Sequence, residues 1–181
     1  AEVLTSVEAV GLKCVYPGGS AFGPAGGAAW HVAGWVTGDD ASMRPDLKPR
    51  TRRVEACQLG GLVKRACEDV FASPVAWVAP VHHWATELDH DSGDWLPAWL
   101  RGVGVQPNEL KHADAVAMDV GDDGFAGSLD TLIQELGKTD FALLIPGSAV
   151  VGMLHHHVQV WWRTAAEDVA AKLMALADAE T

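Results

Sequence analysis

Alternating apolar and polar residues, or short unbroken apolar runs, mark six segments of the chain. A period of two is typical of a strand with one covered face, and an unbroken run such as DFALLIPG of a strand covered on both faces. Pro80 removes one backbone donor, so its strand is expected at a sheet edge or a bulge. The turn Pro146-Gly147 should separate the last two strands. The predicted strands are 10–16, 30–37, 74–84, 115–120, 140–147 and 153–162.

Helical spacing of apolar residues marks three further segments. Gly60 and Gly61 weaken the first helix and indicate either a kink or a close packing contact. Ser128 is placed to cap the second helix and Gly137 to end it, and residues 164–167 match a capping box for the third. The predicted helices are 53–71, 129–136 and 165–178.

These elements predict an α+β fold in which residues 1–181 form a single domain. A mixed β-sheet of about five to six strands would carry two to three packed helices. The length suits one core, and 49% hydrophobic residues can fill it. Two stretches lack a regular pattern and are expected to be a long basic surface loop, 38–53, and an irregular, acidic, Trp-rich segment, 85–112.

Charge is unevenly distributed along the chain, whose formal net charge is −11. Residues 44–65 hold 7 of the 13 basic side chains and only two acidic ones. The acidic remainder would repel nucleic acid, so nucleic-acid binding is not expected apart from this basic segment. No apolar run approaches the roughly 20 residues of a membrane span, so no membrane partner is expected either.

Three cysteines, Cys14, Cys57 and Cys67, share no CxxC spacing. Cys57 and Cys67 fall in one predicted helix and would lie roughly 15 Å apart along it, too far for a disulfide. We therefore expect three reduced, mostly buried thiols, a reducing compartment and a cytoplasmic location.

Three consecutive histidines interrupt the last predicted strand, in GMLHHHVQVWWR. Alternation would place His155 and His157 together on the more polar face and His156 on the apolar face beside Leu154 and Val160. A buried imidazole needs a hydrogen-bond partner, so His156 should have one through a ring nitrogen. The His-x-His pair suits two ligands of one divalent metal ion, such as zinc, iron or manganese.

A third ligand is needed for such a site, and VHHWATELDHD supplies the candidates. An open coordination position would then activate water, which is hydrolase chemistry. The spacing to a third ligand is not that of a known motif, so a strand face of partly exposed histidines is the alternative. The candidate third ligands are His82, His83, Glu87, His90 and Asp91.

Four of the eight tryptophans adjoin histidines, acids or predicted loops. Aromatic side chains ringed by polar groups are typical anchors of protein interfaces, although the same rings could pin a long loop to the body. The candidate interface residues are Trp84, Trp95, Trp99 and Trp161.

Two roles from different classes follow. No catalytic constellation is complete, because both a GxSxG nucleophile motif and a phosphate-binding P-loop are missing from the sequence. The sequence therefore favours a non-enzymatic interaction protein, inhibitor-like or an assembly subunit, that binds another protein or itself through its acidic Trp- and His-rich surface. The alternative is a metal-dependent hydrolase built on His155 and His157.

Overall fold

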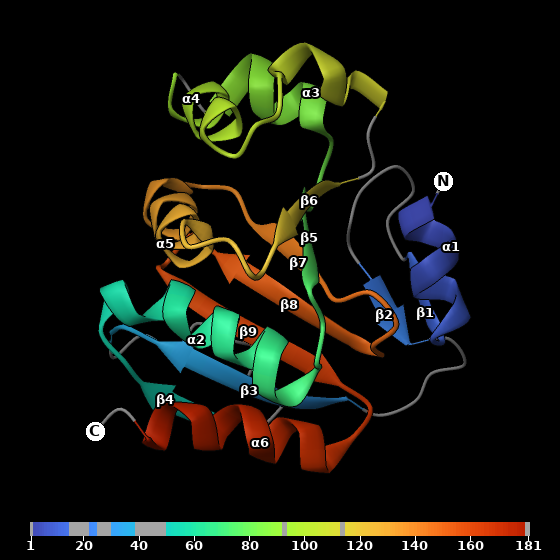
Figure 1. Cartoon of the computed structure of the whole chain (residues 1–181), viewed down its shortest axis with the longest axis vertical. Coiled ribbons are helices and arrows are strands. Elements are labelled where there is room, and N and C mark those ends of the chain that lie inside the picture. The colour runs from blue at the N-terminus through green and yellow to red at the C-terminus, as the bar shows by residue number, and fades with distance from the viewer. Residues whose placement is uncertain are drawn as a thin grey trace.

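The computed structural model describes residues 2–14, 22–24, 30–38, 50–91, 94–112 and 115–179. Its centre is one seven-stranded sheet in the order β4-β3-β9-β8-β7-β5-β6 (Figure 1). Strands β3 and β4 are parallel and all the other neighbours are antiparallel. The α+β class and the mixed sheet are confirmed, but the strand count exceeds the predicted five to six. The strands are β3 (His31–Val36), β4 (Arg50–Arg53), β5 (Val75–Pro80), β6 (Val116–Asp119), β7 (Phe141–Leu144), β8 (Val150–His155) and β9 (Gln159–Thr164).

Short helices are more numerous than the predicted two to three, because the segment 85–112 is largely helical rather than irregular. Its apolar side chains, among them Leu96, Leu100 and Leu110, are buried. The helices are α1 (Glu2–Ala9), the 3₁₀ helix η3 (Ala56–Gln58), α2 (Leu59–Arg65), the π-helix η4 (Ala66–Val70), α3 (Trp84–Thr86), the π-helix η5 (Glu87–Asp91), α4 (Trp95–Gly102), the 3₁₀ helix η6 (Pro107–His112), α5 (Phe125–Glu135) and α6 (Glu167–Asp178).

Helices α2, α5 and α6 cover one face of the sheet and enclose the main core (Figure 1). On the other face, Val7 of α1 and Leu12 pack on Leu144 and Val151. Leu12 belongs to β1 (Leu12–Cys14), which pairs with β2 (Phe22–Pro24) in a separate small sheet. No helix in the described part of the chain is long and apolar enough to cross a membrane.

The predicted single strand 153–162 is instead a β-hairpin. β8 ends at His155, β9 begins at Gln159, and the three residues between them form the turn. Val158 closes this turn with a φ of 57°, a left-handed conformation that β-branched residues rarely adopt. Glycine or asparagine normally marks such a position, so the sequence carried no turn signal.

Two further strands differ from the expectation. β4 forms at the end of the predicted loop 38–53, whose residues 39–49 lie outside the described part. Arg50 and Arg52 of β4 pair with Glu167 and Asp178 of α6. β5 is an inner strand, and Pro80 is tolerated there because it is the last residue of the strand.

The predicted helix boundaries hold in part. α5 begins at Phe125, so Ser128 lies inside the helix and is not its cap. Gly137 follows α5 with a φ of 64°, as the predicted ending requires. The last helix starts at Glu167, and Thr164 Oγ1 accepts the backbone N–H of Ala166 instead of forming a capping box.

Gly60 lies at a close contact between α2 and α5. A Cβ at this position would lie 2.1 Å from the carbonyl oxygen of Ala126, and the Gly60 N–H donates to Asp130 Oδ1 at 2.7 Å. A Cβ at Gly61 would meet nothing within 4 Å. Of the two readings of the glycine pair, the close packing contact therefore applies to Gly60 alone.

This pair provides a matched test of helix packing. Gly60→Ala should lower the free energy of unfolding by about 1–3 kcal/mol, because the methyl group meets backbone that cannot move aside. Gly61→Ala should leave it unchanged or raise it by up to about 1 kcal/mol, since alanine is the better helix former. Urea unfolding of both variants measures this, and equal effects at the two positions would contradict the packing.

Candidate metal centre

Three imidazoles converge at the tip of the β8–β9 hairpin. The rings of His155 and His156 stack with centroids 4.3 Å apart, and His157 stands edge-on to them at 4.9 and 4.4 Å. One ring nitrogen from each of the three lies within 4.8 Å of the others. The turn produces this convergence, because consecutive side chains would point to opposite faces of a continuous strand.

Asp140, the residue before the neighbouring strand β7, holds His156. Its Oδ1 accepts the backbone N–H of His156 at 2.9 Å and lies 2.8 Å from His156 Nδ1. A carboxylate can only accept hydrogen bonds, so we assign the ring proton to Nδ1. His156 Nε2 then keeps its lone pair, as in histidines that bind a metal while a carboxylate orients them.

His155 is the most enclosed of the three, with a side chain 13% exposed against 29% for His156. Burial lowers the pKa of His155, the nearby Asp140 carboxylate raises it, and the neighbouring imidazoles lower it further. Its Nδ1 accepts the backbone N–H of His157 at 3.2 Å, so a metal bound there would replace that hydrogen bond.

The predicted exposure of His155 and His156 is wrong, because no residue in the sequence signals the turn between β8 and β9. His156 has the predicted ring partner, but it lies in the turn, half-buried, and not on the core face with Leu154. His155 is less exposed than His156, the reverse of the expectation. The alternation itself holds in the strands, since Met153 pairs with Trp161 and Leu154 with Val160.

The other predicted ligands do not join the cluster. His82 and His83 are exposed and reach the same end of the sheet, because the Val81 N–H donates to the Asp140 carbonyl. However, β7 lies between β5 and β8. Glu87 is buried and accepts a hydrogen bond from Thr139 Oγ1 at 2.8 Å. The side chains of His90 and Asp91, in η5, lie outside the described part.

Three of the four candidate interface tryptophans belong to the core. Trp84 is 5% exposed and packs edge-on against Phe141, and Trp99 is 6% exposed. Trp161 is fully buried, and only Trp95 is half-buried. Trp84 and Trp99 pin the helical segment to the body and Trp161 belongs to β9, so only Trp95 is left as a surface candidate.

The cysteines are free where the structure describes them. Cys67 is buried, and burial raises the pKa of its thiol to about 12, which makes it unreactive. Cys57 is exposed, contrary to the expectation of mostly buried thiols, and the side chain of Cys14 lies outside the described part. The cytoplasmic location stays a prediction.

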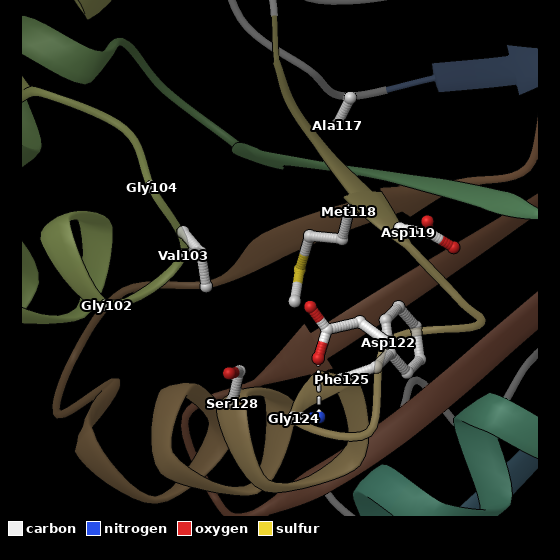
Figure 2. A pocket seen from close by; sticks show the side chains of 10 residues that line it. All are labelled: Gly102, Val103, Gly104, Ala117, Met118, Asp119, Asp122, Gly124, Phe125 and Ser128. Carbon is white, nitrogen blue, oxygen red and sulfur yellow. Dashed lines mark hydrogen bonds between the residues drawn. The ribbon is translucent and has the colours of Figure 1, made fainter.

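A cavity of about 440 Å³, not expected from the sequence, lies between the end of α4, strand β6 and the first turn of α5 (Figure 2). Asp119 and Asp122 line it, and each accepts the backbone N–H of the glycine two residues later, Gly121 or Gly124. The repeated Asp-x-Gly in DVGDDG signals these turns. Nothing in the sequence signals the cavity, because α4 comes from a different segment.

Comparison with protein-family models, with curated proteins and with solved structures finds no match to this chain. The geometry of the histidine cluster and of the cavity therefore indicates what the chain can bind.

The partly buried imidazole of His155 predicts a loss of stability in mild acid. Its pKa in the folded protein is below the 6.5 of an unperturbed histidine, so the unfolded chain takes up more protons as the pH falls below 6.5. The stabilisation is complete above 6.5 and is lost as the pH falls toward the lowered pKa. Urea unfolding with chelator present, between about pH 7.5 and about pH 5.5, should show a shallower loss for His155→Gln than for the wild type. An equal or steeper loss in the variant would contradict this assignment.

Proposed function

We propose that this chain binds one divalent transition-metal ion through His155, His156 and His157. The observation that carries the proposal is the convergence of three ring nitrogens within 4.8 Å beside a carboxylate that orients one of the rings. Imidazole nitrogens suit zinc and iron better than magnesium or calcium, which prefer oxygen ligands.

The nitrogens need only small movements to fit such an ion. Zinc binds imidazole at about 2.0–2.1 Å, which places tetrahedral ligands roughly 3.3 Å apart. Rotation of the exposed His157 ring and release of the His155 hydrogen bond to the backbone would bring the nitrogens closer. Three protein ligands would leave a fourth position to water, as in catalytic rather than closed structural sites.

The structure bears on both roles expected from the sequence, the metal-dependent hydrolase and the interaction protein. A hydrolase would also need a substrate site beside the histidines, and the cavity described above is lined by other residues. Metal-dependent hydrolysis therefore stays a prediction. The interaction role loses most of its predicted surface, because Trp84, Trp99 and Trp161 are buried, and it also stays a prediction.

Metal titration of chelator-treated protein tests the proposal. The wild type should bind one equivalent of Zn²⁺ or Co²⁺ in equilibrium dialysis. His155→Gln, His156→Gln and His157→Gln should each weaken binding by more than the roughly 10–100-fold that loss of an outer partner costs. His82→Gln and His83→Gln are the matched controls, because these imidazoles lie at the same end of the sheet outside the cluster. Equal binding by the wild type and the His155→Gln/His157→Gln double variant would refute the site.

Asp140 should act as a positioning residue for His156. Asp140→Asn should lower metal affinity by about 10–100-fold while one equivalent still binds, because the ligands remain but the charged acceptor for Nδ1–H is lost. Asp168→Asn, at an exposed carboxylate in α6, is the control. If Asp140→Asn binds metal as the wild type does, the carboxylate has no orienting role.

A further inference from the structure

The outer edge of β6 offers backbone groups that no strand in the described part of the chain covers. β6 ends the sheet order, with β5 as its one neighbour there. The Val120 N–H donates to the Pro74 carbonyl at 2.9 Å, and inward- and outward-pointing residues alternate along an antiparallel strand. Ala117 therefore turns both its N–H and its C=O outward, and Asp119 turns its N–H outward. The Asp119 carbonyl accepts the Asp122 N–H at 3.3 Å.

The cavity lies beside this edge. Its apolar walls come from Val103, Met118 and Phe125. The Asp122 carboxylate lies near the end of the Met118 side chain, and the Ser128 hydroxyl lies on α5 below them (Figure 2). The α4 side is formed partly by Gly102 and Gly104, which have no side chains to fill the entrance. Helices α3 and α4 lie beyond the β6 end of the sheet (Figure 1). The cavity separates the end of α4 from β6, so α4 does not pack directly on this part of the edge strand.

The charge of the cavity favours a cation. One oxygen of Asp122 accepts the Gly124 N–H at 2.6 Å, which leaves the second oxygen for another donor. The ion pairs found among the described residues do not include Asp119 or Asp122. Lys64 Nζ lies 3.5 Å from the backbone carbonyl of Asp122.

We propose that β6 and this cavity dock an extended peptide segment of another protein, which pairs with the outer edge of β6 and places a lysine or arginine side chain in the cavity. Edge pairing supplies sequence-independent hydrogen bonds, and the pocket selects one side chain. An acidic segment would face Asp119 and Asp122. A second copy of this chain is disfavoured because both copies carry a net charge of −11. The docking surface is independent of the histidine cluster and gives the interaction role a different location.

Three labelled peptides of one design test the proposal by fluorescence anisotropy. The first alternates lysine with valine, the second replaces each lysine by glutamate, and the third keeps lysine but has N-methylated backbone nitrogens. The lysine peptide should bind, more weakly as salt is raised. The glutamate and N-methylated peptides should bind at least about tenfold more weakly, since one lacks the charge and the other the edge hydrogen bonds. Absence of lysine-peptide binding, or binding of either control peptide as tight as that of the lysine peptide, overturns the proposal.

Variants of the protein separate the two parts of the surface. Asp122→Asn keeps the oxygen that accepts the Gly124 N–H and should weaken lysine-peptide binding by about tenfold. Asp123→Asn is the matched control, because it removes one charge outside the cavity lining. Ala117→Pro removes an outward N–H without touching the ladder to β5, so it should abolish binding while thermal unfolding confirms the fold. Wild-type affinity in Asp122→Asn overturns the proposal, whether or not the proline variant folds.

Discussion

The turn at residues 156–158 sets the register on which the sheet and its histidines depend. It pairs His155 with Gln159, so Leu154, Val160 and the buried Trp162 face the main core. A slip by one residue would exchange Trp161 and Trp162 between the two faces of the sheet. That exchange would break the packing on both faces, because Trp161 lies directly over Gly34, where a Cβ would come within 2.3 Å of its ring, and Trp162 packs edge-on against Trp35.

The same turn holds Val158 in a conformation that costs roughly 1–2 kcal/mol for a residue with a Cβ. Its side chain packs against the main core, and its carbonyl accepts the Thr37 Oγ1–H at 2.9 Å. These contacts offset the strain and fix the hairpin tip against β3. Backbone strain that the surroundings maintain is often found at functional sites, and here it gathers three imidazoles that a continuous strand would separate.

The local sequence pattern correctly predicted those strands in which apolar side chains repeat on the face that packs on the core. The strands at 30–37, 115–120 and 140–147 were correct because the apolar side chains that face the core are buried along each strand. The hairpin was missed because Val158 occupies a position that glycine normally marks. Asp140 was missed as the partner of His156 because sequence spacing does not show that β7 and β8 are neighbours. The tryptophans of 84–99 were misread because acidic neighbours suggested a surface, whereas Trp84 and Trp99 point inward.

The two candidate sites lie at opposite ends of the sheet. Asp140 and the histidines adjoin the end of β5 at Pro80, whereas Asp119 of the cavity pairs with Val75 at its beginning. Metal bound at the proposed hairpin site would stabilise the folded state by mass action. Without a second conformation that distinguishes liganded from free protein, it would not change the affinity of the proposed peptide site at β6. Sites so separated, with no shared side chain, should contribute additively to stability. A measured coupling between metal and peptide would therefore require a shift of β7 or β5, the strands that join the two ends.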